Sequence, residues 1–229
     1  MWRRFAVIMV VLSLSLGAIA GEVIDRIVAT VNKRPLLQSD WEDELHFEAF
    51  LQGRPVSSLT DAERSSALDR LVDQELLRQQ MQTDFSLDEK QLDDRLKQVR
   101  AQTPGGATEQ GWHTVLASYS MDEAQLRSKL AMQMQLLRFI DLRLRPNARI
   151  DRETIAEYYR DTLVPQVKAK GADPEPLEAV SGKIRELLSQ QRMDELLTSW
   201  LQNLRGQSRI QMMMARGSRV VDLTSGTTK

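Results

Sequence analysis

Flexible apolar and aromatic side chains are the residues of this sequence that most clearly suggest a function, which is noncovalent binding. Met132, Leu136 and Phe139 recur at helical spacing, and Trp112 and Tyr119 precede them in the chain. Flexible apolar side chains can bind many different apolar segments through weak contacts. Trp and Tyr add an apolar body with a hydrogen-bonding edge. These five residues are therefore candidates for the noncovalent binding of another polypeptide.

The same five residues have a second interpretation as core. Met132, Leu136 and Phe139 lie about 130° from the main apolar stripe of their helix, at about 100° per residue, so that helix is apolar on two sides. Either both sides are buried between helices, or one of them lines an open crevice. Trp112 and Tyr119 likewise fit either core packing or a wall of that crevice.

Residues suited to catalysis or to metal binding are scarce. His46 and His113 are the only histidines, and neither has a second ligand at metal spacing on its helix face. The chain has no cysteine, and it shows no phosphate loop, nucleophile elbow or paired catalytic carboxylates in a recognisable frame. We therefore expect no catalytic residue, no bound metal and no cofactor.

The first twenty residues have the pattern of a secretory signal peptide. Arg3 and Arg4 precede an apolar run, and Ala18 and Ala20 form an A-x-A cleavage signal before Gly21. This predicts an exported protein, cleaved between Ala20 and Gly21, with no stable membrane insertion afterwards; an uncleaved anchor is the alternative. Without residues 1–20 the formal net charge is minus three, which favours neither nucleic acid nor an anionic membrane as a partner.

The remaining sequence predicts a mainly helical protein with a few short strands. A β-branched stretch, residues 23–31, and a turn at Asn32 predict a hairpin near the amino terminus. Four hydroxyl residues followed three positions later by glutamate predict helix starts at Ser39, Thr60, Ser86 and Ser120.

The later elements follow from periodicity and breakers. We expect a short helix over 109–118, then a long helix that ends before Pro146 and whose buried stripe is Leu126, Leu130, Met134, Leu137, Ile140 and Leu144. The remaining predicted segments are a helix over 151–163, a linker over 164–176, a helix and strand over 177–214, and a disordered tail over 215–229.

Several stretches of this pattern resemble the SurA N-terminal domain family of periplasmic chaperones. They are E-V-I-D-R-I-V-A-T-V-N-K-R-P-L-L-Q-S-D-W-E at 22–42, L-V-D-Q-E-L-L-R-Q-Q-M at 71–81, I-D-R-E-T-I-A-E-Y-Y-R at 150–160, and the helix of 184–205 with its following strand. The resemblance implies a multi-helix chaperone core over 21–163, whose amino-terminal hairpin pairs with the strand that ends the 177–214 segment. Proteins of this kind carry parvulin isomerase domains where residues 164–176 stand, and so short a segment cannot form one.

This resemblance implies an ATP-independent periplasmic holdase, not an enzyme. Its partners would be unfolded segments of envelope or outer-membrane proteins, bound in an apolar crevice. A noncatalytic adaptor that assembles one envelope complex is the alternative, and a prolyl isomerase is a third, weaker hypothesis.

Overall fold

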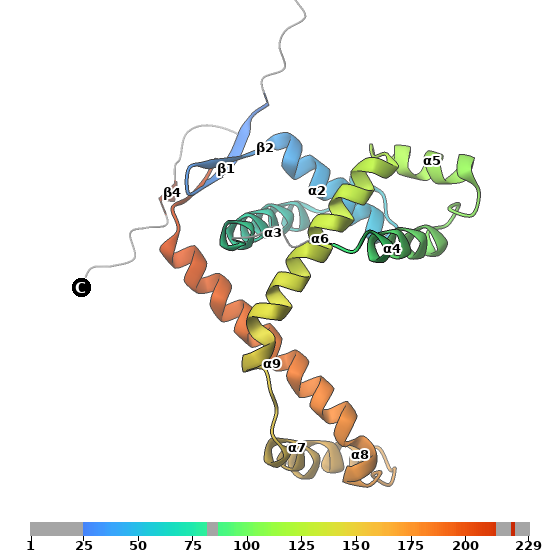
Figure 1. The fold of residues 1–229 in the computed structure, drawn as a ribbon, viewed down its shortest axis with the longest axis vertical. Helices are drawn as coiled ribbons and strands as arrows, with labels where there is room; N and C mark the ends of the chain where they lie inside the picture. Colours follow the sequence, from blue (N-terminus) through green and yellow to red (C-terminus); the bar gives the residue numbers. More distant parts are fainter. Residues whose placement is uncertain (1–24, 82–86, 214–220, 223–229) are drawn as a thin grey trace, which may run out of the picture.

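The computed structural model describes residues 25–81 and 87–213 in full, and the backbone of residues 221–222. It shows a mainly helical protein with one small antiparallel sheet, which confirms the predicted fold class (Figure 1). The predicted signal peptide lies outside the described residues. Among the described residues, the structure contains no helix with the length and apolar character that crossing a bilayer requires.

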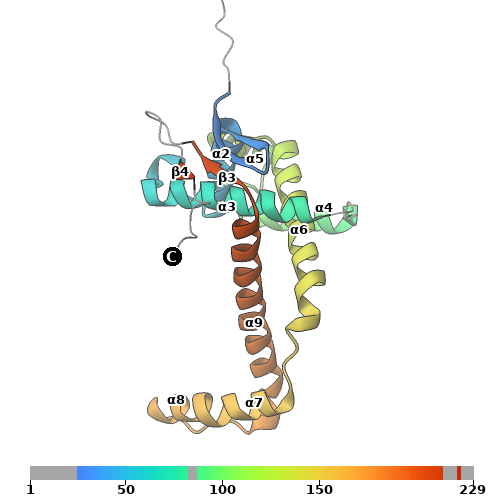
Figure 2. The ribbon, with the colours of Figure 1, turned by 90° about the vertical axis from the view of Figure 1, so that its left-hand side faces the viewer.

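The molecule has three parts, which we call the body, the stem and the foot. The body comprises the described residues of 25–135 together with 201–213, and it contains the sheet. Two helical segments, 136–149 and 185–200, descend from it and form the stem (Figure 2). At the far end of the stem, residues 150–184 form the foot, whose helices run across the stem.

The elements follow one another in the chain with short connections. The body contains β1 (Ile27–Val31), β2 (Arg34–Leu37), α2 (Gln38–Leu51), α3 (Asp61–Gln80), α4 (Glu89–Gln102) and α5 (Glu109–Ser118). Then come α6 (Glu123–Leu144), α7 (Arg152–Tyr158), a π-helical segment (Tyr159–Leu163), α8 (Val164–Ala169), α9 (Leu177–Gln207), β3 (Ile210–Met212) and β4 (Val221–Asp222).

The sheet joins the two ends of the described chain. Its strand order is β2-β1-β3-β4, and each neighbouring pair is antiparallel. Val31 is paired with Arg34 on one side and with Ile210 on the other. Asn32 and Lys33 form the hairpin turn with φ of 51° and 75°, values that a two-residue turn between twisted strands requires. The predicted pairing of the hairpin with a late strand is therefore confirmed.

Asn32 connects three separate segments of the body. Its backbone N–H donates to the Arg209 carbonyl at 2.9 Å, and its Oδ1 accepts from the Arg209 N–H at 2.8 Å. Its Nδ2 donates to Gln79 Oε1 on α3 and to Ser208 Oγ before β3, both at 3.0 Å. One short side chain thus fixes the hairpin turn against α3 and against the approach to β3.

Three apolar clusters that share residues lie in the body, and one of them extends into the stem through Ile140 and Leu144. One lies under the sheet and includes Val31, Leu76 and Leu204, and another surrounds Trp112 and Leu126. The third is smaller and lies between α2 and α3; Trp41 links it to the first cluster, and Tyr119 links it to the second. These shared contacts make the body one continuous core.

The foot has one small cluster of its own. Its buried residues are Ile155 from α7 with Val180 and Ile184 from α9. Tyr158 and Tyr159 pack against it, and the Tyr159 hydroxyl donates to the Glu175 carbonyl at 2.7 Å. This bond fastens the segment between α8 and α9 to the π-helical segment within the foot.

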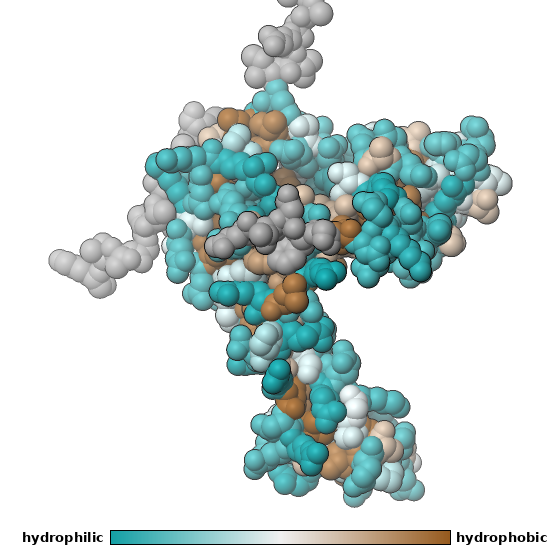
Figure 3. Space-filling model, viewed as in Figure 1, coloured by the Kyte–Doolittle hydropathy of each residue, from teal (hydrophilic) through white to brown (hydrophobic). Residues whose placement is uncertain are grey.

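Most of the predicted stripe of α6 is buried, with one exception. Leu126, Leu130, Ile140 and Leu144 are buried, whereas Leu137 is 60% exposed. The prediction is wrong for Leu137 because the stem is only two helices thick and leaves outer faces of α6 uncovered. Hydrophobic side chains reach the surface of the stem and foot among hydrophilic ones (Figure 3).

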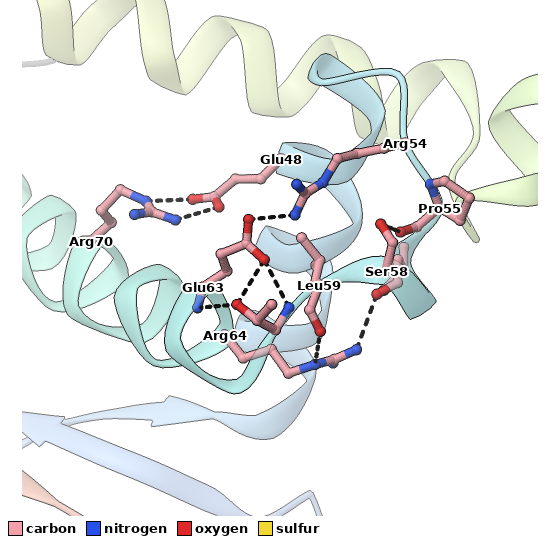
Figure 4. A network of polar contacts seen from close by, with 10 residues as sticks. Glu48, Arg54, Pro55, Ser58, Leu59, Glu63, Arg64 and Arg70 are labelled. Carbon is pink, nitrogen blue, oxygen red and sulfur yellow. Dashed lines mark hydrogen bonds and ion pairs between the residues drawn. The ribbon is translucent and has the colours of Figure 1, made fainter.

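The predicted capping box at Thr60 is confirmed and is part of a polar corner between α2 and α3. The Glu63 carboxylate accepts from the Thr60 N–H and hydroxyl, both at 2.8 Å, and from Arg54 Nη2 at 2.5 Å (Figure 4). These donors lower the pKa of Glu63 to about 2, because each of them favours the charged carboxylate.

Two other predicted capping boxes are wrong. The fourth is predicted at Ser86, which lies outside the described residues, but the N-cap of α4 is Asp88. The helix near Ser39 begins at Gln38, and the Ser39 hydroxyl donates to the Asp25 carboxylate. At the start of α6 it is Asp122, not Ser120, that accepts the Gln125 N–H, at 2.7 Å. A carboxylate caps as well as a hydroxyl does, so several adjacent polar residues compete for one helix start.

The predicted linker over 164–176 is partly wrong. The helix that begins at α7 continues through the π-helical segment and α8, and only the residues after Ala169 are without helix. Pro165 lies in the first turn of α8, directly after the π-helical segment. At this position the missing proline N–H does not interrupt a regular series of α-helical hydrogen bonds. The disordered tail is also corrected in part, because Val221–Asp222 pair with β3.

Candidate functional site

A groove on the body runs between α2, α3 and α6, with β2 at one end. It consists of two adjoining hollows of about 330 and 310 Å³, which share Asp43, Lys129 and Met132. We call it the Met132 groove. Its apolar lining is Met132 and Leu136 from α6, Leu71 from α3, Pro35 and Leu36 from β2, and Met121 before α6.

Helix geometry places the two central residues of the groove. Met132 and Leu136 are four positions apart on α6, so they lie one above the other on one face of the helix. Met132 is 43% exposed, and Leu136 packs against the core under the sheet. The groove therefore has a fixed wall at Leu136 and an accessible, flexible side chain at Met132.

The third predicted residue on this helix face turns elsewhere. Phe139 packs against Trp200 of α9, with the ring centroids 5.7 Å apart, and it lines neither hollow. It lies where α6 leaves the body and meets α9. Phe139 therefore contributes to the junction of body and stem, and the predicted binding face ends at Leu136.

Trp112 does not line an open surface, which corrects the prediction for this residue. Its side chain is fully buried, and its Nε1 donates to Glu123 Oε2 at 2.5 Å. The Phe50 ring meets it edge-on with centroids 6.1 Å apart. The indole N–H, which suggested a binding role, is thus hydrogen-bonded inside the body.

Tyr119 lies on a different hollow from Met132. It is half-buried, with its ring centroid 5.5 Å from that of Phe50. The hollow has a volume of about 610 Å³ and lies between the end of α2 and helices α4 and α5, with Val115 and Pro104 in its lining. The five predicted residues are therefore not one surface, because only Met132 and Leu136 share a groove.

A buried carboxylate holds two residues of the groove lining, Gln74 and Lys129. Glu44 of α2 is 5% exposed and accepts from Lys129 Nζ at 3.1 Å and from Gln74 Nε2 at 2.9 Å. Because removing a charge from water costs several kcal/mol, these partners are what make its burial tolerable. The ion pair also holds the Lys129 side chain at the centre of the groove.

The comparison with known protein families identifies the family. The sequence profile of the SurA-like N-terminal domain matches residues 1–139, which is more than half of the chain. The chain belongs to the SurA-like N-terminal domain family. No curated protein gives a significant match to the chain.

The SurA-like match contains the whole lining of the Met132 groove. It includes the hairpin and α2 to α5, and it ends within α6 at residue 139, beyond Leu136. The stem's second helix, the foot and β3 lie after the matched residues. Membership of this family indicates a chaperone-type role for the protein, and proteins of the SurA type are typically periplasmic.

A second buried glutamate belongs to the SurA-like body. Glu75 of α3 is 5% exposed and accepts from Arg78 Nε at 2.8 Å and from Gln79 Nε2 at 2.6 Å. Arg34 Nε lies 3.5 Å from it, which connects β2 to α3 beside the groove. Glu75 therefore holds one end of the Met132 groove together.

Sequence reasoning missed both buried glutamates, because charged residues of helices usually lie on solvated faces. A signal was present for Glu75, which is four residues after Leu71 and three after Val72, within the apolar stripe of α3. For Glu44 the deciding contacts come from Gln74 and Lys129, which are distant in sequence. Among the described residues, no group of three His, Cys, Asp or Glu is placed to hold a metal ion.

Proposed function

We propose that this protein is an ATP-independent periplasmic holdase that binds unfolded segments of envelope or outer-membrane proteins in the Met132 groove. The observation that carries the proposal is an accessible methionine beside a fixed apolar wall, within the part of the chain that defines the family. An unbranched thioether side chain adapts to many different apolar surfaces, which is what a chaperone without a single client needs.

The size of the groove supports weak and reversible binding. A hollow of about 330 Å³ has room for a large apolar side chain and its backbone. Burying one such side chain contributes about 1.5–3 kcal/mol to the binding free energy. A client held this weakly can dissociate without an energy source. Several side chains bound in succession along an unfolded client would add to this affinity.

The charges around the groove support a broad client range. Lys129 and Arg34 lie in its lining together with Asp40 and Asp43, so both signs are present. A mixed rim neither selects strongly for nor repels a client of one charge. The apolar lining, not the rim, is therefore the part expected to choose the bound segment.

Export is the second part of the proposal. The charged start, apolar run and A-x-A signal of residues 1–20 support secretion with cleavage between Ala20 and Gly21. The chain has no cysteine, so its fold needs no disulfide in an oxidising compartment. Amino-terminal sequencing of the protein from the periplasmic fraction tests this; a retained Met1 would contradict cleavage.

Photocrosslinking tests the groove directly. A photoreactive benzoylphenylalanine at Met132 should crosslink to a urea-unfolded outer-membrane protein diluted into buffer. The matched control is the same probe at Leu137, which lies on the same helix, is more exposed at 60%, and lines neither hollow of the groove. Equal yields from both positions would show unspecific apolar contact and contradict the groove.

An aggregation assay tests the activity. The purified protein should slow the aggregation of an unfolded client at near-stoichiometric ratio, and Met132→Glu should need about tenfold more protein for equal protection, because a charge replaces an apolar contact. Leu137→Glu serves as the control and should protect normally. No protection by the wild-type protein across several clients would refute the holdase.

Two further experiments on this protein distinguish the alternative functions. Crosslinking in cells from Met132 should return many envelope proteins if the protein is a holdase, and one dominant partner if it is an adaptor. A protease-coupled assay on a proline peptide should give no rate above background, because we propose a noncatalytic protein. A rate above background would refute that part.

A further inference from the structure

The elbow where the stem meets the foot has a cleft that the proposed client groove does not include. The cleft is about 420 Å³ in volume and lies between the end of α6, the residues after it, and α9. We call it the elbow cleft; its lining includes Arg145, Ala148, Arg149, Ile150, Arg185 and Met193. Ala148 is buried, and Ile150 and Met193 are half-buried, so the floor is apolar and the rim carries guanidinium groups.

Most arginines of the body have a carboxylate partner, whereas most of the arginines that line the elbow cleft have none in the described part of the chain. In the body, seven arginines pair with a carboxylate: Arg34, Arg54, Arg70, Arg78, Arg100, Arg127 and Arg205. At the elbow only Arg145 does so, with both Asp141 oxygens within 2.9 Å of its Nε. Among the described residues, Arg149 and Arg185 have no carboxylate within ion-pair distance.

The surroundings of the cleft strengthen its positive potential. Between residues 138 and 152 the chain has five arginines and two aspartates. Both aspartates are engaged, since Asp141 binds Arg145 and Asp151 caps α7 by accepting the Thr154 N–H at 2.8 Å. Of the two acids in the lining, Glu186 makes no ion pair among the described residues, although its charge acts on Arg145. The free guanidiniums of Arg149 and Arg185 therefore outnumber it.

We propose that the elbow cleft binds an acidic segment of a polypeptide, in which carboxylates are adjacent to an apolar side chain. The planar guanidiniums of Arg149 and Arg185 match the two oxygens of a carboxylate, and the apolar floor at Ile150 and Met193 takes the neighbouring side chain. A concave cleft of this size suits a peptide better than a membrane, because membrane binding needs a protruding apolar face.

This inference concerns a site separate from the Met132 groove, so it stands or fails independently of the holdase proposal. In the full-length protein, a fluorescein-labelled peptide of Glu, Leu and Ser should bind more tightly than the matched peptide in which every Glu is Gln. Its affinity should fall as sodium chloride rises from low to physiological concentration, because exposed charge pairs are screened. Equal binding of the two peptides would overturn the proposal.

Two matched variants locate the binding. The double variant R149A/R185A should weaken binding of the acidic peptide about tenfold, since two exposed charge contacts with its carboxylates are lost. The control R160A/R192A removes as much charge from exposed positions outside the cleft and should bind normally. Met132→Glu should also bind normally. An equal loss in R160A/R192A would mean unspecific attraction and would overturn the proposal.

A membrane is the competing ligand. Sedimentation with vesicles of phosphatidylglycerol and phosphatidylcholine should give little binding, and R149A/R185A should not change it. Strong vesicle binding that depends on Arg149 and Arg185, together with no peptide binding, would overturn the proposal in favour of a lipid site.

Discussion

The body and the foot are built from similar helices, but they bury apolar side chains on different scales. In the body, Trp41 and Tyr119 each belong to two clusters, so removing one contact affects a continuous core. In the foot, Ile155, Val180 and Ile184 are the only buried members of one cluster among the described residues. We therefore expect the cooperativity of unfolding to depend more on side chains that belong to two clusters than on helix content.

The largest expected effect is in the body, at Trp112. Trp112→Ala should lower the free energy of unfolding by about 3–5 kcal/mol, because it leaves a cavity beside Phe50 and removes the partner of Glu123. Trp112→Phe keeps an aromatic ring and should lose clearly less. Urea unfolding followed by circular dichroism measures both variants. Equal losses would contradict the cavity argument.

The matching change in the foot should have a smaller and local effect. Ile184 is 3% exposed, and Ile184→Ala should cost about 2 kcal/mol, because a small cluster can close around the missing atoms. Hydrogen exchange should become faster in α7 and α8 and should remain unchanged in α3. Faster exchange in both places would show that the body and the foot unfold as one unit.

The ion pair between α9 and the body should contribute still less to the free energy of unfolding. Arg205 Nε donates to Asp73 Oδ1 at 2.6 Å, and this bond raises the pKa of Arg205 by stabilising its charged form. Arg205→Ala should cost about 1 kcal/mol of unfolding free energy, as expected for a partly exposed charged pair. Arg192→Ala, on the exposed part of α9, is the control and should change stability little. No change at Arg205 would contradict this contribution and would leave the apolar contacts of Leu201 and Leu204 under the sheet, together with β3, to attach α9.

The smallest expected effect concerns the acid sensitivity of the body. The folded pKa of Glu63 is about 2, below its ordinary value of 4.5, so its contribution to stability is present above the ordinary value and disappears as pH falls toward 2. Glu63→Gln should lower stability at pH 7 and converge with the wild type near pH 2. Thermal melts across this range measure the difference, and parallel curves would contradict the assignment.

Local pattern predicted the elements well where one signal acted alone. Helix α5 was predicted with the observed bounds, and the stop before Pro146 and the pairing of the hairpin with β3 are confirmed. Prediction failed where neighbouring residues competed, as Asp122 did with Ser120. It also failed where a helix continued through a proline, as at Pro165, because the π-helical segment that accommodates it leaves no mark in composition.

The candidate site was predicted only in part. Met132 and Leu136 share a groove, and helix periodicity alone placed them together. Trp112 was misassigned because its burial depends on Phe50 and Glu123, and the relevant distances are set by tertiary packing. An exposed aromatic residue and a buried one have the same appearance in a single sequence, so such errors arise wherever long-range contacts decide burial.

The hydrogen bonds of Asn32 have a consequence for the order in which the molecule folds. Its partners at Ser208 and Arg209 are separated from it by 176 and 177 positions. An exported chain folds after it crosses the membrane, and the local hairpin can form before the distant β3 reaches it. Until then β1 has an open edge, and the unfolded protein itself needs the protection that we propose it gives to others.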